Sequence, residues 1–227
     1  MIATTTVIVT VATSFLGILA TYLVIWFGVP KSLRLQDATQ SVTTFHRQLP
    51  LILFNIAVMN AGTWLALGQV ESRFVLDTPW WIVALNVLFI FMVEDTWVYG
   101  WHRAMHEVKF LYRKVHRIHH QAYAPLPVHY LYVHPLEWMV GSLGAALGLL
   151  LVALFHGHAC AYTLWTFSVM RQLHEMNVHS GMRSVITRFI PFAGRTDSHD
   201  YHHRYPTKGN YESTFFFWDR VLKTAAK

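Results

Sequence analysis

Charged residues and cysteine are both scarce in this sequence. Charged side chains make up 13% of the 227 residues, against about 25% in soluble domains, whereas apolar residues make up 54%. The single cysteine, Cys160, excludes a disulfide framework within the chain and a metal site built from several thiolates. We expect Cys160 to be a small buried residue. This composition is typical of a membrane protein.

The sequence also contains no recognisable motif for binding haem, flavin or nicotinamide. Electrons for a redox reaction would therefore have to come from a separate protein. The formal net charge is +6, but the basic residues do not gather on one amphipathic stripe with interleaved aromatic residues. We therefore do not expect the chain to bind nucleic acid.

Four apolar stretches are long enough to cross a bilayer as helices, which takes about 20 residues. They are residues 6–29, 49–67, 80–101 and 138–155. A weaker stretch, residues 159–169, would return to the same side. Gly144 and Gly148 in the fourth stretch have the spacing for close helix packing, although glycine is also generally frequent in membrane helices. We predict an all-α integral membrane protein with about four transmembrane helices.

The basic residues indicate the orientation of these helices. If the first helix runs from outside to inside, every Lys and Arg except Arg73 lies on the cytoplasmic side, as the positive-inside rule requires. The membrane is either the endoplasmic reticulum of a eukaryote or a bacterial inner membrane. Residues 185–192 form a short amphipathic run, which is either an interfacial helix on the lipid surface or an ordinary buried helix.

Ten of the 15 histidines fall into three clusters and a looser pair. The first cluster is spaced H-x-x-x-H, and the other two are spaced H-x-x-H-H. The candidate metal ligands are His102, His106, His116, His119, His120, His174, His179, His199, His202 and His203. Residues three and four apart share one face of a helix, so the first histidine of each H-x-x-H-H unit is expected to face both later ones. Ten imidazoles are enough for two ions with about five nitrogens each.

Several motifs around these histidines resemble those of one known family. They are EDTW at residues 94–97, HRxxH at 102–106, HRIHH at 116–120, HPLE at 134–137, HSG at 179–181, AG at 193–194, HDYHH at 199–203, GNY at 209–211 and FWDR at 217–220. Together they resemble the fatty acid hydroxylase superfamily, the membrane di-iron group that includes sterol desaturases and C-4 methylsterol oxidases. The resemblance extends from about Phe91 to Thr224 and does not depend on the first two membrane segments.

The resemblance implies oxygen-dependent attack on a C–H bond of a membrane lipid, which gives a hydroxylated or desaturated product. It implies two non-haem iron ions, O2 as co-substrate and an external electron donor of the cytochrome b5 or ferredoxin type, which the basic cytoplasmic face would dock. Nine of the ten histidines match the ligand pattern of the family. His174 fits less well, because it lies five residues before His179 and does not share a helical face with it.

The whole chain, residues 1–227, is predicted to be a single domain. Residues 1–79 would form membrane anchor helices, and residues 80–227 would form the catalytic core with a cytoplasmic helical cap that holds the dimetal site. A homo-oligomer is also compatible with this prediction.

Two carboxylates are candidates for supporting the metal ligands. Asp95 precedes His102 by seven residues, so it lies on the same helical stripe and would accept the free ring N–H of a ligand histidine; the alternative is a salt bridge to Arg103. Asp200, inside the third cluster, invites the same interpretation. His134 of the HPLE motif is either a ligand, a support for a ligand, or a structural residue at the turn before the fourth membrane segment.

Two other classes of function remain open from the sequence. A metal transporter or storage protein would place ionisable ligands along a path through the membrane helices, whereas these clusters gather at one end. A bis-histidine haem protein would need one histidine on each of two facing helices, which leaves most of these histidines unexplained.

Overall fold

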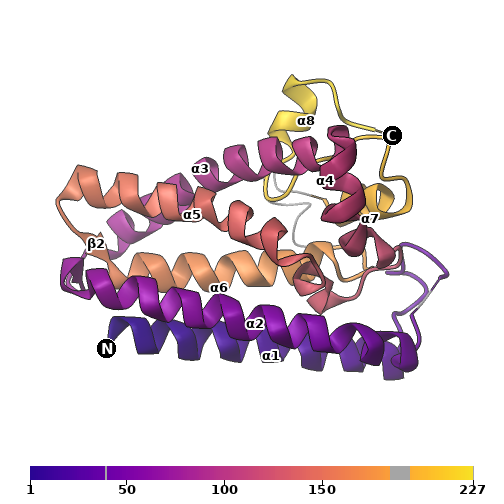
Figure 1. Cartoon of the computed structure of the whole chain (residues 1–227), viewed down its shortest axis with the longest axis horizontal. Helices are drawn as coiled ribbons and strands as arrows, with labels where there is room; N and C mark the ends of the chain where they lie inside the picture. Colours follow the sequence, from indigo (N-terminus) through magenta and orange to yellow (C-terminus); the bar gives the residue numbers. More distant parts are fainter. Residues whose placement is uncertain (39, 185–194, 227) are drawn as a thin grey trace.

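The computed structural model describes residues 1–38, 40–184 and 195–226. Within these residues, five long helices run alongside one another, and short helices gather at one end (Figure 1). The long helices are α1 (Ile2–Phe27), α2 (Val42–Val70), α3 (Trp80–Glu107), α5 (Pro135–His156) and α6 (Ala161–Val178).

The shorter elements lie in the connections and after α6. They are η1 (Glu71–Arg73), β1 (Phe74–Val75), α4 (Lys109–Lys114), η2 (His116–Gln121), η3 (Pro127–Leu131), β2 (Ala159–Cys160), α7 (Thr196–Arg204) and α8 (Phe217–Val221). The strands β1 and β2 pair in parallel at the end of the bundle opposite α4, α7 and α8 (Figure 1). The short helices at the other end, with η2, form a cap over the ends of the long helices.

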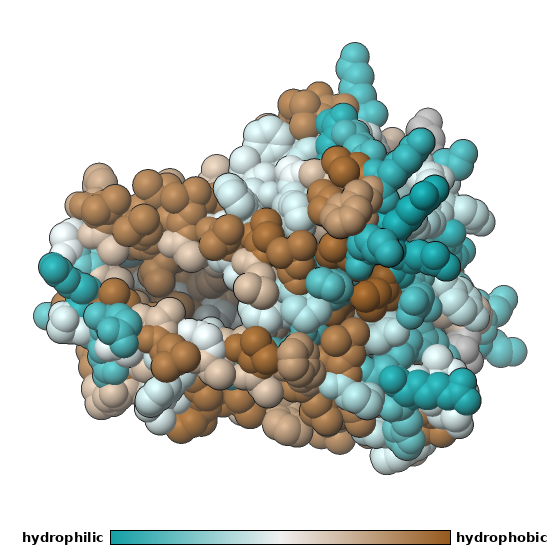
Figure 2. Space-filling model, viewed as in Figure 1, coloured by the Kyte–Doolittle hydropathy of each residue, from teal (hydrophilic) through white to brown (hydrophobic). Residues whose placement is uncertain are grey.

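Four of the long helices, α1, α2, α3 and α5, are long and apolar enough to cross a membrane. Large apolar side chains such as Leu16, Leu150 and Phe155 point outward from them, and Figure 2 shows apolar residues covering the helical body while hydrophilic residues gather at the cap. An outward-facing apolar surface of this extent requires a lipid environment rather than water. The predictions of an all-α fold and of a membrane protein are confirmed.

Among the four predicted membrane helices, α2 and α3 extend furthest beyond the apolar stretches that predicted them. Helix α2 begins at Val42 because the hydroxyl of Ser41 accepts a hydrogen bond from the backbone N–H of Thr44 (3.1 Å). Helix α3 continues past Trp101 to Glu107, so that His102 and His106 lie on its last turns. The weak stretch predicted at residues 159–169 is the first part of α6, which continues to Val178.

The helices α3 and α5 pack closely because two glycines of α5 face α3. A Cβ atom placed on Gly144 would lie 2.8 Å from Cβ of Trp97, and one placed on Gly148 would lie 3.1 Å from Cα of Ile90. The structure therefore favours the packing interpretation of this glycine pair. Helix α1 packs in turn on α2 and α6, whereas α2 and α5 make little contact with each other.

The loops at the cap end carry most of the basic residues, whereas Arg73 lies at the opposite end. This distribution agrees with the predicted topology, and the cytoplasmic placement of the cap stays a prediction. The predicted amphipathic helix at residues 185–192 lies outside the described residues.

Replacing Gly144 with valine should separate α3 from α5. The added side chain would collide with Trp97 and with the backbone of Glu94, and overpacking of this kind costs about 1–3 kcal/mol. We expect a lower midpoint of thermal unfolding in detergent for Gly144→Val. Gly141→Val is the matched control, because a Cβ there meets no atom within 4 Å; equal midpoints for the two variants would contradict this account of the packing.

Candidate metal centre

Nine of the ten predicted histidines converge in the cap as two groups. In each group, one potential ligand atom from every residue lies within 4.8 Å of the others. We call the first group site A; it consists of His102, His106, His116, His120 and His202. We call the second group site B; it consists of His119, His179, His199 and His203.

The ring nitrogens within each site are spaced as ligands of one ion would be. In site A, Nε2 of His116 lies 3.1 Å from Nε2 of His102 and 3.0 Å from that of His120. In site B, Nε2 of His199 lies 3.0 Å from that of His179 and 3.2 Å from that of His203. Two nitrogens that are each about 2.1 Å from one ion and at right angles to each other would be about 3 Å apart. The spacing therefore fits a metal ion at the centre of each site.

The two H-x-x-H-H units are shared crosswise between the sites. His116 and His120 of η2 belong to site A, whereas His119 belongs to site B. Helix α7 does the reverse: His199 and His203 belong to site B, and His202 belongs to site A. The first histidine lies beside both later ones, as the spacing predicts: the ring of His116 is 5.5 Å from that of His119 and 4.6 Å from that of His120. The two later histidines nevertheless belong to different sites, because successive residues of a helix point in different directions. Each unit therefore contributes ligands to both sites.

The outer ring nitrogens of several histidines are held by carbonyl and carboxylate oxygens. The Nδ1–H of His102 donates to the carbonyl oxygen of Tyr211 (2.9 Å), and that of His202 donates to the carbonyl oxygen of Gly209 (2.8 Å). The Nδ1–H of His179 donates to the backbone of Glu175 (2.9 Å). These bonds place the proton on Nδ1 and leave the lone pair of Nε2 facing the site, as metal ligation requires.

A carboxylate supports one further ligand. Nδ1 of His116 lies 3.0 Å from Oε1 of Glu137, the last residue of the HPLE motif. Nε2 of His202 is buried and has no hydrogen-bond partner among the described residues. An orphaned ring nitrogen that points into a group of four other imidazoles fits a site that holds a metal ion.

Burial keeps these imidazoles in the neutral, ligating form. Burial, followed by the proximity of other histidines, lowers the pKa of His199, His202 and His203 well below the usual value. Burial also lowers the pKa of His119 to about 4. Neutral imidazole is the form that binds metals, so the sites are ready to bind at neutral pH without first losing protons.

The segment after α7 holds the carbonyl groups that orient the ligands. Gly209 has a positive φ of 101°, and a Cβ there would lie 2.0 Å from the carbonyl oxygen of Thr224, so the turn requires glycine. Asp219 accepts hydrogen bonds from the backbone N–H groups of Tyr211 (3.1 Å) and Glu212 (2.7 Å). The GNY and FWDR motifs thus position the carbonyls that contact His202 and His102.

The predicted supporting carboxylates have other partners in this structure. Oδ1 of Asp95 accepts from the backbone N–H groups of Thr214 (2.8 Å) and Phe215 (3.1 Å), and Arg103 pairs with Glu107 instead. Asp95 therefore contacts neither a ligand histidine nor Arg103, the two partners considered from the sequence. The segment after α7 passes α3 at this point and provides the hydrogen-bond donors instead. Asp95 and Asp219 both accept hydrogen bonds from the backbone of the segment after α7. Asp95 therefore supports the metal ligands indirectly, through the segment whose carbonyl groups contact them.

Asp200 and two predicted histidines also lie away from the ligand groups. Asp200 accepts from Gln36 (2.8 Å) and pairs with Arg204 (2.9 Å), because it faces out of α7 toward the loop after α1. His134 caps α5, because its Nδ1 accepts a hydrogen bond from the backbone N–H of Leu136 (3.1 Å). Of the three roles considered for His134, this is the structural one at the turn before the fourth membrane segment. His174 is in neither group, and its Nε2–H donates to the carbonyl oxygen of Ser213 (2.9 Å).

A cavity of about 260 Å³ extends from both sites into the helical body. Its walls include His102 and His116 of site A and His119, His179 and His199 of site B. Apolar side chains from the surrounding helices line most of the rest: Met59, Val98, Trp101, Met105, Leu131, Val133, Trp138, Ala145 and Phe167. Figure 2 shows a hollow in the apolar face between α5 and α2, the two helices that make little contact. A lipid would therefore have an apolar route to the histidines.

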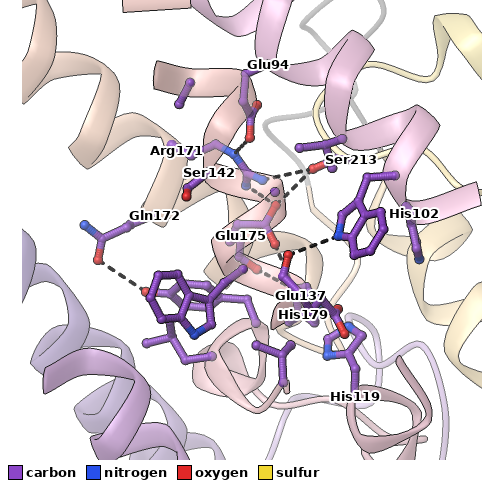
Figure 3. A pocket seen from close by; sticks show the side chains of 18 of the residues that line it. Glu94, His102, His119, Glu137, Ser142, Arg171, Gln172, Glu175, His179 and Ser213 are labelled. Atoms are coloured by element: carbon purple, nitrogen blue, oxygen red, sulfur yellow. Dashed lines mark hydrogen bonds and ion pairs between the residues drawn. The ribbon is translucent and has the colours of Figure 1, made fainter. Parts of the chain in front are cut away.

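Polar residues of α3 and α6 also reach this cavity. Glu94, Arg171 and Glu175 form a line of charged groups that leads toward His179 (Figure 3). Of these contacts, only the ion pair between Arg171 and Glu175 could have been predicted from the sequence, because the two residues are four apart on a helix. Glu137 belongs to a motif that carried the family resemblance, but nothing in its spacing pointed to contact with His116.

The fold and the two histidine groups define a helical membrane protein with two clusters that could each hold a metal ion. The family model described as fatty acid hydroxylase matches residues 87–224, which is more than half of the chain. The chain belongs to the fatty acid hydroxylase family, as the motifs indicated.

Relatives with assigned activities include two classes of enzyme. A very-long-chain aldehyde decarbonylase of Oryza sativa is 34% identical over 207 residues, which are 87% of this chain and 76% of that protein. Methylsterol monooxygenase 2-2 of Arabidopsis thaliana is 35% identical over 79% of this chain and 64% of its own length. Methylsterol monooxygenase 1 of Rattus norvegicus is 35% identical over 64% of this chain and 48% of its own length. No solved structure matches the chain.

The number of metal ions bound per chain tests whether the histidines form two separate sites. We expect about two metal ions per wild-type chain, and about one for either His119→Ala or His202→Ala, because each variant removes a ligand from a different site. The double variant should retain almost none. His158→Ala, an exposed histidine at the opposite end of the bundle, should match the wild type. Elemental analysis of the purified protein measures the ratio, and loss of both ions in each single variant would contradict two separate sites.

Proposed function

We propose that the protein is a membrane di-iron oxygenase that hydroxylates or desaturates a lipid of the sterol or fatty-acyl type. The observation that carries this proposal is a pair of all-histidine sites that both open onto one apolar cavity. When bound, two iron ions would supply the activation of O2 and the oxidation of a C–H bond. Iron suits the proposal better than zinc because zinc does not change its oxidation state.

The residues of the chain would contribute position and exclusion of water. Apolar side chains such as Val98, Ala145 and Phe167 offer no hydrogen bonds, so the cavity favours a lipid chain or ring system over water. Ligands of both sites line the same cavity, so a lipid bound there would lie beside the histidines of both sites. The relatives named as monooxygenases and decarbonylases act on different groups, and placement of the substrate carbon would decide which reaction occurs.

The whole chain would work as one domain. The anchor helix α2 contributes Met59 to the cavity, and the loop after α1 contributes Gln36 to the bond with Asp200. The division into anchor helices and catalytic core therefore describes the order of segments rather than two independent units. We place the cap in the cytoplasm, on the basis of the basic loops at that end.

A basic surface lies beside site A and is suited to an electron donor. Lys109, Arg113, Lys114 and Arg117 are exposed on α4 and η2, and the ring of Tyr112 between them lies 5.5 Å from that of His106. Positive charge steers the approach of an acidic protein. A small acidic donor of the cytochrome b5 or ferredoxin type would thus dock near the ligands of one metal site.

The alternative of a metal transporter has less support. Transport through the membrane needs ionisable ligands along the path, whereas both histidine groups found in the described ranges lie in the cap. Metal uptake into vesicles without any oxidation of lipid would favour that alternative.

The proposed function is tested by supplying the reconstituted protein with iron, a reductant and membrane lipids under 18O2. We expect 18O in a lipid product or the loss of two hydrogens from it. His119→Ala should lower turnover at least about a hundredfold, since it removes a ligand rather than a group that merely supports one. Mass spectrometry measures the products with His158→Ala as the control, and full activity of His119→Ala would contradict the proposal.

Charge reversal on the basic surface should weaken the use of a protein donor. For Arg113→Glu with Lys114→Glu we expect a KM for an acidic donor raised about tenfold at low salt, with the difference shrinking as salt is added. Activity with a small chemical reductant should stay at the wild-type level, because the metal sites are untouched. Steady-state kinetics with both electron sources makes the comparison, and an unchanged KM would rule out this docking surface.

A further inference from the structure

A buried ion cluster lies in the wall of the cavity. Nε of Arg171 donates to Oε1 of Glu94 (2.6 Å), and the same guanidinium pairs with Glu175. The hydroxyl of Ser213 donates to Oε1 of Glu175 (3.2 Å). Figure 3 shows Glu94 at the end of this line that is farther from His119 and His179. The cluster joins α3, α6 and the segment after α7.

The cluster has one more carboxylate than it has cations. Arg171 is shared between Glu94 and Glu175, and Oε2 of Glu94 has no hydrogen-bond partner among the described residues. Glu94 is only 4% exposed and lines the cavity. A buried carboxylate oxygen without a donor is costly, so this atom calls for a donor that arrives with a ligand.

The metal sites do not account for Glu94. Its ion-pair partner is Arg171, and it precedes His102 by eight residues on α3, which is about 12 Å along the helix axis. Several other residues that line the cavity, among them Val98, Ala145 and Phe167, are apolar. Glu94 therefore offers a free carboxylate oxygen at a point along α3 that is distant from the metal ligands.

We propose that the cavity binds a lipid alcohol, and that the hydroxyl group of this lipid donates a hydrogen bond to Oε2 of Glu94. This inference rests on the proposed function and names the substrate class of the same cavity. The hydroxyl is then held at one end, and the carbon skeleton extends along the apolar walls toward the histidines. Glu94 is a specificity residue in this account, because the anchored hydroxyl sets which carbon reaches the metal sites.

The chemistry excludes lipids whose polar group only accepts hydrogen bonds. An aldehyde, ketone or methyl ether would place an oxygen lone pair against the carboxylate and leave it unsatisfied. Sites built to pair with a hydroxyl reject analogues that lack it much more strongly than sites that sense only shape. The hydroxyl could belong to a polycyclic alcohol or to a long-chain alcohol, and both belong in the test.

The experiment compares matched alcohols and ethers as ligands of the full-length protein in detergent. Tritiated cholesterol and hexadecanol are the two alcohol probes, each paired with its methyl ether in competition binding. We expect one alcohol to bind at least about tenfold more tightly than its ether, and the pair that shows this preference identifies the skeleton. Ethers that bind within threefold of both alcohols would overturn the proposal without any variant.

Glu94→Gln then tests the assigned residue. The amide keeps the size of the side chain but presents an N–H donor that ethers can also use, so the preference for the alcohol should fall below threefold. Glu107→Gln is the matched control, since Glu107 lies on the same helix as Glu94 and also pairs with an arginine, Arg103, but is exposed. If Glu94→Gln still binds the alcohol tenfold more tightly than its ether, Glu94 is not the residue that binds the hydroxyl. If this variant fails to fold, the comparison of alcohol and ether binding by the wild-type protein decides the proposal.

Binding is measured without turnover, so its result is separate from the test of function. Selective binding of an alcohol with no incorporation of oxygen would contradict the proposed oxygenase while leaving the binding site intact. Oxidation of a lipid with no preference for alcohols would contradict Glu94 as the anchor while leaving the oxygenase intact.

Discussion

The structure depends on buried imidazoles that present their lone pairs to two common points. Lone pairs about 3 Å apart repel one another unless a proton or a cation lies between them, and burial strongly disfavours the proton. A cation at each point removes this conflict. A metal ion in each site would therefore stabilise the arrangement of α3, η2, α7 and the end of α6, and metal binding would then be coupled to the folding of the cap.

The crosswise sharing of the two H-x-x-H-H units explains why the sites come as a pair. His119 and His120 are adjacent on η2 and belong to different sites, and the same holds for His202 and His203 on α7. If only one of the two sites bound a metal ion, each H-x-x-H-H unit would have at least one histidine that ligates no metal. The segment after α7 completes the arrangement: Asp95 and Asp219 hold its backbone, and its carbonyl groups orient His102 and His202.

Much of this was accessible from the sequence because its signals are local. Apolar length located the membrane helices, and histidine spacing singled out nine residues that the structure brings together. The contacts of Asp95, Asp200 and His174 were not accessible, because their partners Thr214, Gln36 and Ser213 are distant in the chain. The helical stripe that suggested Asp95 as a support for His102 was real, but a later segment occupies the space beside it. The ion cluster at Glu94 likewise depends on α3 packing beside α6, which no spacing within one helix reveals.

The most direct test of the account is a structure of the iron-loaded protein with the anomalous signal of iron. The account predicts two separate peaks, one within bonding distance of His102, His116 and His202 and the other within bonding distance of His119, His179 and His199. A single peak, or an iron bound by both His119 and His120, would contradict the crosswise pair of sites on which the proposed chemistry depends.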